Sequence, residues 1–184
     1  MFKGSIVALV TPFKEGKIDE DSLRNLVDWH VSEGTDGIVP VGTTGESPTL
    51  DHSEHKKVVE IVIDQCNKRI PIIAGTGSNS TSEAINLLEH AEDAGADAAL
   101  IVTPYYNKPT PEGIYAHYEA LDSASKKLPI IVYNIPSRSV IDIQPNLMGK
   151  LSNLESITPI SSEDFKIRFC IETLLLTNFS ISIF

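Results

Sequence analysis

The chain has 184 residues, 41% of them hydrophobic, which is long enough for one domain with a sizeable core. A formal net charge of −10 argues against nucleic acid and anionic membrane surfaces as partners, although a local cationic pocket can still take a small acidic substrate. Two cysteines make no disulfide framework, no apolar run reaches the ~20 residues of a membrane span, and the first residues lack a signal-peptide cleavage site, so we expect a cytoplasmic protein.

Five short β-branched runs alternate with helical patterns along the chain. The runs begin at Ser5, Gly37, Pro71, Ala98 and Pro129 and are apolar almost throughout, which is typical of strands buried on both faces in a parallel sheet. Apolar residues at helical spacing, with capping residues at the ends, predict helices within 18–34, 51–66, 80–95, 110–121 and 144–154.

Five strand–helix units indicate an α/β fold, either a doubly wound sheet or a (β/α)8 barrel. No GxGxxG motif follows the first strand, which lowers the dinucleotide-binding alternative. Polar residues cluster just after the predicted strands, and a barrel gathers those strand ends on one face. The barrel is therefore favoured.

The loop "GTTGES" after the second predicted strand is one candidate site. Gly42 and Gly45 allow a sharp turn with exposed N–H groups, and Thr43 and Thr44 add two hydroxyls, so the loop could hold a carboxylate or an oxyanion. The alternative is a strand-end turn whose threonines cap the next helix.

Two further strand ends carry chemistry-bearing residues. Tyr133 and Arg138 follow the fifth strand, and a phenol beside a permanent cation suits an acid substrate that needs proton transfer. Tyr105 and Tyr106 follow the fourth strand, where adjacent tyrosines are more often packing residues with one ring on the surface. For Tyr133 and Arg138, the alternative is a tyrosine at the edge of the core and an arginine on the surface.

His52 and His55 have the spacing of helix-borne metal ligands, but no third ligand lies near them in the sequence. We interpret them as a solvated helix face and expect no metal. Nothing in the sequence indicates a cofactor box, a P-loop or a nucleophile elbow, so no cofactor is expected either.

Taken together, "GIVPVGTTGE", "LIVTPYYNKP" and "YNIPSR" resemble the dihydrodipicolinate synthase (4-hydroxy-tetrahydrodipicolinate synthase) family. The wider group holds the pyruvate-dependent class I aldolases, including N-acetylneuraminate lyase. The resemblance runs from Met1 to about Ile157. The double threonine of "GTTGE" and the arginine of "NIPSR" look like the synthase rather than the lyase.

The resemblance implies a (β/α)8 barrel, usually a homotetramer, that condenses pyruvate with aspartate 4-semialdehyde on the diaminopimelate route to lysine through a lysine Schiff base. Carried over by motif, Tyr133 donates and accepts the proton, and Thr43 links it to Tyr106, which reaches in from a neighbouring subunit. Thr44 holds the pyruvate carboxylate, and Arg138 receives the carboxylate of the semialdehyde.

The sequence departs from the family at the imine-forming lysine. An ungapped alignment from "YNIPSR" puts Ser161 at that position, and a serine hydroxyl cannot form an imine. Lys166 lies about 16 Å further along an extended strand, at an odd offset that points it to the opposite face. Little or no activity is therefore expected.

We predict a partial barrel domain of about five βα units in residues 1–157 and a non-family tail in 158–184. The chain looks truncated or frameshifted, with strands one and five as unpaired edges, which puts the family's tetramer in doubt. The main hypothesis is the synthase reaction. The alternatives are another pyruvate aldolase of the group, similar to N-acetylneuraminate lyase, and a non-catalytic remnant.

Overall fold

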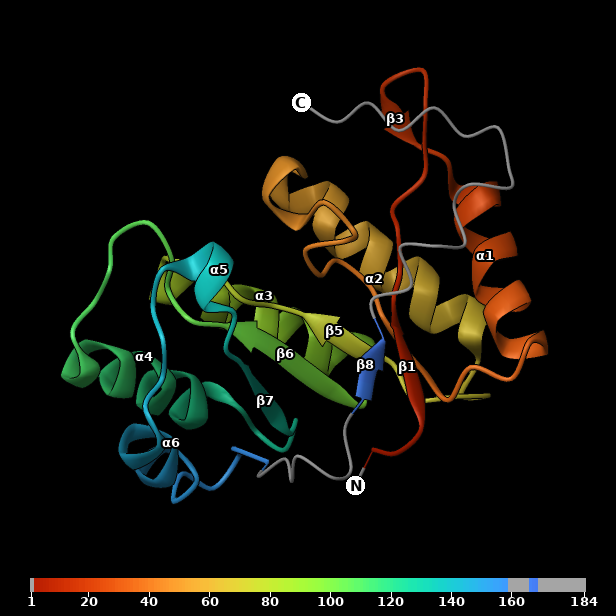
Figure 1. Ribbon diagram of the computed structural model, residues 1–184. Coiled ribbons are helices and arrows are strands. Elements are labelled where there is room, and N and C mark those ends of the chain that lie inside the picture. The colour runs from red at the N-terminus through yellow and green to blue at the C-terminus, as the bar shows by residue number, and fades with distance from the viewer. Residues whose placement is uncertain (1, 159–165, 169–184) are drawn as a thin grey trace.

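The computed structural model describes residues 2–158 and 166–168. Its frame is a series of parallel strands, each followed along the chain by a helix (Figure 1). The strands are β1 (Ser5–Ala8), β4 (Gly37–Val39), β5 (Ile73–Gly75), β6 (Ala98–Val102) and β7 (Ile130–Tyr133). The helices are α1 (Glu20–Ser32), α2 (His52–Cys66), α3 (Thr81–Ala94), α4 (Pro111–Ala124) and α6 (Pro145–Leu151). The five predicted strand–helix units are confirmed.

The strands pair in chain order as two parallel sheets that an isolated bridge joins, and among the described residues they do not close into a barrel. β1 pairs with β4, and β5 with β6 and β6 with β7, all in parallel. A parallel bridge between Ile38 and Ile72 joins the two sets of strands. Five parallel strands, each followed by a helix, are part of the eight strand–helix units of a (β/α)8 barrel, and within the described residues they do not form a closed ring.

Apolar side chains fill both faces of the sheet. One face packs against the helices in the larger cluster, where Leu23, Val62, Leu88 and Leu121 are fully buried. The other face forms a second cluster that consists mainly of strand residues, namely Ile6, Val39, Ile73, Ala98, Leu100 and Ile131. Burial on both faces explains why the strand sequences show no polar alternation.

The free side of β1 is occupied, contrary to the expectation of an unpaired edge there. Strand β8 (Lys166–Arg168) pairs with it in parallel, with Ser5 opposite Lys166 and Val7 opposite Arg168, as the blue and red arrows of Figure 1 show. At the other end of the sheet, Ile157 forms a bridge to Ile130 of β7. An extended segment that reaches an edge satisfies its backbone groups whatever its side chains are, so both edges find partners.

Four short elements were not predicted. Strands β2 (Phe13–Lys14) and β3 (Lys17–Ile18) form an antiparallel hairpin. The 3₁₀ helix η1 (Ser47–Thr49) precedes α2, and α5 (Pro136–Ser139) is a single helical turn after β7. Within the described residues, no helix has the length and apolar character that crossing a membrane requires.

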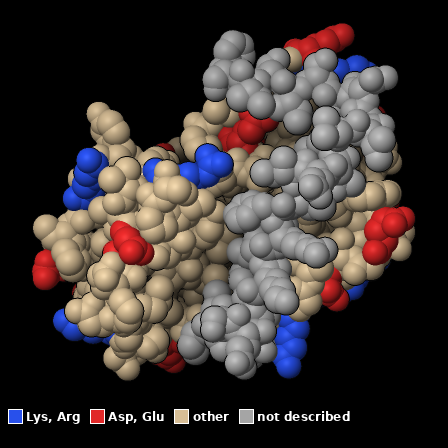
Figure 2. Space-filling view, viewed as in Figure 1, with Lys and Arg blue, Asp and Glu red and all other residues tan. Residues whose placement is uncertain are grey.

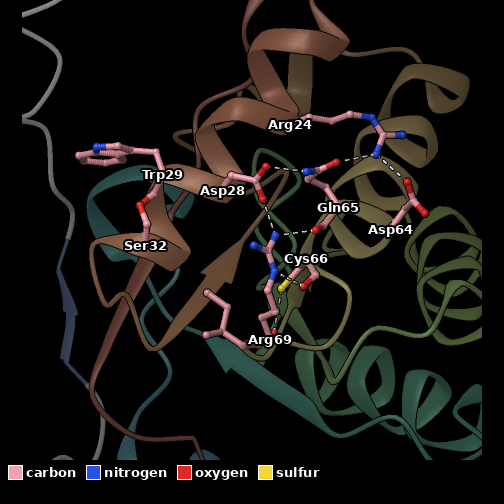
Figure 3. A network of polar contacts seen from close by, with 9 residues as sticks. Arg24, Asp28, Trp29, Ser32, Asp64, Gln65, Cys66 and Arg69 are labelled. Carbon is pink, nitrogen blue, oxygen red and sulfur yellow. Dashed lines mark hydrogen bonds and ion pairs between the residues drawn. The ribbon is translucent and has the colours of Figure 1, made fainter.

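A polar network fixes α1 against α2 (Figure 3). Arg24 Nη1 donates to Asp64 at 2.6 Å and to Gln65 at 3.0 Å, and Gln65 in turn donates to Asp28 at 2.7 Å. Arg69 Nη2 donates to the second oxygen of Asp28 at 2.5 Å and holds the pKa of that carboxyl below its ordinary value. The network joins the two helices that follow the paired strands β1 and β4.

Two aspartates just before strands hold the neighbouring strand in register. Asp36, before β4, accepts a hydrogen bond from the Ser5 N–H at 2.6 Å. Asp97, before β6, accepts one from the Ile72 N–H at 2.8 Å. Each aspartate thus satisfies an amide at the amino end of the strand beside its own, where the sheet ladder has not begun.

The Asp97→Ala variant is therefore expected to lose about 1–2 kcal/mol of unfolding free energy, because the Ile72 amide is left without its partner in a partly buried place. Urea denaturation measures the loss. Asp93→Ala is the matched control, since Asp93 forms an exposed pair with Lys126 and should change stability by less than about 0.5 kcal/mol. Equal losses in the two variants would contradict a role in strand register.

Candidate active site

A cavity of about 260 Å³ opens where β4, β5, β6 and β7 end. Its lining includes Thr43, Gly75, Gly77, Tyr105, Tyr133 and Arg138. Parallel strands in a barrel present their carboxyl ends on one face, and loops there form the sites of such enzymes. The cavity therefore lies on the face where the sequence predicted chemistry.

Tyr133 is the last residue of β7 and is half-buried at the cavity. Burial raises the pKa of its phenol above the ordinary value of 10.0, while Thr43 and the charge of Arg138 act in the opposite direction. Its hydroxyl is buried and has no hydrogen bond to any described residue, so Thr43 lies near it without the geometry of a hydrogen bond. At neutral pH the phenol is protonated.

Arg138 projects from α5, the helical turn that begins at Pro136. The turn is held by Ser139, which is buried and whose hydroxyl donates to Ile135 and Ile141 at 3.0 Å each. Arg138 itself is exposed and forms no ion pair with a described residue. On the face shown in Figure 2, Lys and Arg atoms lie over the region of α5, beside surface that is neither acidic nor basic. The cation is thus available to an acid at the mouth of the cavity.

Of the two predicted threonines, only one lines the cavity. Thr43 is exposed on the loop after β4 and belongs to the lining. Thr44 is half-buried and does not. Successive residues of a loop cannot be assigned to a pocket from sequence alone, because their directions depend on backbone angles.

The adjacent tyrosines also diverge. Tyr105 lines the cavity, and burial raises the pKa of its phenol. Tyr106 has a left-handed backbone with φ of 70° and is 86% exposed, outside the cavity of its own chain. Sequence reasoning did not single out Tyr105 for this site, and no signal in the sequence distinguishes it from its neighbour.

The interpretation of His52 and His55 as one solvated helix face is wrong for His55. His52 is exposed and pairs with Glu83 at 2.6 Å, whereas His55 is only 4% exposed. The two positions lie three residues apart on α2, and of the two only His55 belongs to the buried face of the helix. Among the described residues, no three His, Cys, Asp or Glu side chains come together as metal ligands.

Two positions of this chain, 161 and 166, bear on the imine-forming lysine. The position of Ser161 falls outside the described residues. The backbone of Lys166 pairs with Ser5 at the amino end of β1, whereas the cavity lies at the carboxyl ends of the strands. The strand register thus puts the Lys166 backbone at the opposite end of the sheet.

A parallel sheet of βα units, with a cavity lined by Thr43, Tyr133 and Arg138 at the carboxyl ends of its strands, defines part of a (β/α)8 barrel whose site lies where such enzymes place theirs. The sequence profile of the Dihydrodipicolinate synthetase family matches residues 1–181. The chain belongs to this family. The relatives described below are named 4-hydroxy-tetrahydrodipicolinate synthases, and this enzyme is a lyase.

Similar proteins include the 4-hydroxy-tetrahydrodipicolinate synthase of Bradyrhizobium diazoefficiens, 60% identical over 159 residues, which are 86% of this chain and 53% of that protein. That of Roseobacter denitrificans is 60% identical over 157 residues, 85% of this chain and 54% of that protein. The chain therefore spans about half the length of the curated relatives it matches.

Solved structures give the same result. The chloride-inhibited dihydrodipicolinate synthase from Acinetobacter baumannii, complexed with pyruvate, has a TM-score of 0.83 and 53% identity, over 86% of this chain and 54% of that one. The enzyme from Aquifex aeolicus has a TM-score of 0.82 and 49% identity, over 88% of this chain and 56% of that one. The predicted family and the partial barrel are confirmed.

Proposed function

We propose that this chain carries the substrate-binding and proton-transfer part of a 4-hydroxy-tetrahydrodipicolinate synthase site. The reaction is the condensation of pyruvate with L-aspartate 4-semialdehyde, in the biosynthesis of diaminopimelate and lysine. The observation that carries the proposal is the cavity that Thr43, Tyr133 and Arg138 line together. The pyruvate complex of the Acinetobacter baumannii relative supports a 2-oxo acid as the ligand. All the relatives named above are synthases, which favours this reaction over that of N-acetylneuraminate lyase.

The proposed roles of Tyr133 and Arg138 fit their surroundings. The raised pKa of Tyr133 keeps its phenol protonated, so it can give a proton to a developing oxyanion and take it back. Arg138 is exposed and permanently charged, and its planar guanidinium suits the carboxylate of the semialdehyde. From the family's motif we also propose that, once pyruvate is bound, Thr43 hydrogen-bonds the phenol and Thr44 binds the pyruvate carboxylate; in this structure, Thr43 makes no hydrogen bond to the phenol and Thr44 lies outside the cavity lining. The exposed Tyr106 is suited to reach the cavity of a neighbouring copy.

The covalent step lacks its nucleophile in this chain. An imine needs a primary amine, and Ser161 at the aligned position offers only a hydroxyl. We therefore propose that the chain binds pyruvate without forming an imine and does not complete the condensation. In this proposal residues 1–157 are the partial barrel domain and residues 158–184 a non-family tail. Relatives that align over 157 to 167 residues support a boundary in this region, whereas the family profile continues to residue 181.

Borohydride trapping tests the proposal. The chain is incubated with pyruvate and sodium borohydride, and its intact mass and peptide masses are measured. No pyruvyl adduct is expected on the unaltered chain, whereas Ser161→Lys should gain one at residue 161. Pyruvate binding to both is measured by ligand-observed NMR.

One control variant and two contrary outcomes make the experiment decisive. Lys166→Ala should behave as the unaltered chain does, because the Lys166 backbone pairs at the far end of β1. An adduct on any lysine of the unaltered chain would contradict the missing nucleophile. Failure of the unaltered chain to bind pyruvate at all would remove the proposed site.

A further inference from the structure

The loop after β4 has a backbone that its residues do not favour. Val41 has φ of 47° and Glu46 has φ of 59°, both in the left-handed region. Val41 is also β-branched and only 1% exposed, and a β-branched residue with positive φ is rare. Such conformations persist only where the surroundings enforce them. The loop from Val41 to Glu46 is therefore held from outside.

The segment that follows β1 provides one of the contacts that fix this loop. The Thr11 hydroxyl donates a hydrogen bond to the Gly45 carbonyl at 2.7 Å, and Thr11 is only 4% exposed. The bond joins residues 34 positions apart and is buried. In a buried place, losing such a donor leaves the carbonyl without a partner, which costs more than the bond itself contributes.

Close packing leaves the loop no room on that side. A Cβ added to Gly45 would lie 2.9 Å from the Leu9 carbonyl oxygen and 3.0 Å from the Val41 nitrogen. On the opposite side, the Gly75 N–H donates to the Pro40 carbonyl at 3.1 Å. The loop is thus fixed between the residues after β1 and the end of β5.

Thr43 is attached to this fixed backbone and lines the cavity. The Gly45 N–H donates to the Gly42 carbonyl at 3.1 Å, so the peptide units on either side of Thr43 and Thr44 are tied together. A displacement of the Gly45 carbonyl therefore moves both threonines.

We propose that Thr11 is a positioning residue: its hydroxyl holds the strained loop Val41–Glu46 so that Thr43 faces the cavity. What the loop binds rests on the proposed function. The position of the loop does not, and the two are measured separately.

Thr11→Val removes the hydroxyl and keeps the shape, whereas Thr11→Ser keeps the hydroxyl. Ligand-observed NMR with pyruvate is expected to show binding about tenfold weaker in Thr11→Val, the equivalent of ~1.4 kcal/mol. Thr11→Ser should bind within about twofold of the unaltered chain, since the net contribution of a single neutral hydrogen bond is retained. Amide resonances of residues 42–46 should shift in Thr11→Val and return in Thr11→Ser.

Tyr118→Phe is the matched control for general loss of stability. It also removes a buried hydroxyl that donates to a backbone carbonyl, that of Ile101 at 2.8 Å, on the side of β6 that faces the helices. We expect it to lower stability but to leave pyruvate binding and the amides of residues 42–46 unchanged.

The outcomes are distinct. Unchanged loop amides and unchanged binding in Thr11→Val would overturn the proposal, as would equal shifts in Tyr118→Phe. If Thr11→Val does not fold, Thr11→Ala removes the same hydroxyl without apolar bulk beside the Gly45 carbonyl, and the same readouts decide. If the unaltered chain does not bind pyruvate, the proposed function fails, and the loop amides alone decide the role of Thr11.

Discussion

Gly75→Ala is expected to lower the free energy of unfolding by about 3 kcal/mol, at the top of the usual range for an overpacked site. Gly75 ends β5, and a Cβ there would lie 2.4 Å from the carbonyl oxygen of Val41 and 2.8 Å from its carbonyl carbon. Both are backbone atoms of the fixed loop, so no side-chain rotation can relieve the overlap. The added methyl group must therefore push the loop or the strand out of place.

Urea denaturation measures this loss, and Gly149→Ala is the control. Gly149 lies inside α6 and its Cβ would meet nothing within 4 Å, so alanine there should stabilise the protein by about 0.5–1 kcal/mol through helix propensity. A Gly75→Ala protein as stable as the unaltered chain would mean that the loop moves freely, contrary to the strained conformation described above.

Acidification should destabilise the protein well before its carboxylates titrate. Burial lowers the pKa of His55 to about 4 and that of His117 to about 4, from an ordinary value of 6.5. Their folded-state pKa is depressed, so the unfolded chain takes up protons first as the pH falls. The stability that the neutral imidazoles contribute is therefore fully present above pH 6.5 and is lost between pH 6.5 and about 4.

The surroundings of the two imidazoles explain the direction. Burial of His55 in α2 is the largest influence on its pKa; the Gly75 backbone and Glu83 favour the charged form, but burial, together with His90 and His52, outweighs them. His117 of α4 accepts or donates one hydrogen bond, with Thr81 at 2.9 Å, and its Nε2 atom has no described partner. Neither site compensates for a buried positive charge.

Urea denaturation across this range should show a loss of about 2 kcal/mol per histidine at about pH 5, as an upper bound from 1.36 kcal/mol per pKa unit. His55→Gln should remove about half of the pH dependence. Carboxyls such as Asp28, whose pKa is lowered by Arg69, add to the loss of stability only at more acid pH. The stability that such a carboxylate gives the folded protein is lost only as the pH falls below the ordinary pKa of the group. Constant stability from pH 7 to about 5 would contradict the prediction.

The regular elements could be read from the sequence because their signals are local. Ser80, the first residue of the helix predicted within 80–95, caps α3 by accepting the Glu83 N–H. The hairpin of β2 and β3 gave no such signal, since its turn puts Glu15 at φ of 52°, which glutamate rarely adopts. The turn α5 is too short for apolar periodicity. The pairing of β8 with β1 depends on contacts between segments far apart in the sequence, which no local pattern reports.

The sequence indicated where the candidate site lies but not how its side chains are arranged. Strand ends and residue types pointed to Thr43, Tyr133 and Arg138, which line the cavity. Which tyrosine of the adjacent pair faces inward depends on the backbone angle at Tyr106. The role of Thr11 was invisible as well, because a threonine after a strand has no signature until the carbonyl of Gly45 is placed beside it.

The pairing of β8 with β1 has a consequence for the order of events during synthesis. β1 leaves the ribosome well before its partner β8, because the paired residues Ser5 and Lys166 are 161 positions apart (166 − 5) in the sequence. Contacts between distant segments form slowly, because a long stretch of chain must close first. Until then β1 presents an open edge to any neighbouring nascent chain, and such edges favour association between molecules. The yield of folded protein should therefore depend on the time between the synthesis of β1 and that of β8. Chaperones that shield the edge of β1 would have their greatest effect before residue 166 emerges.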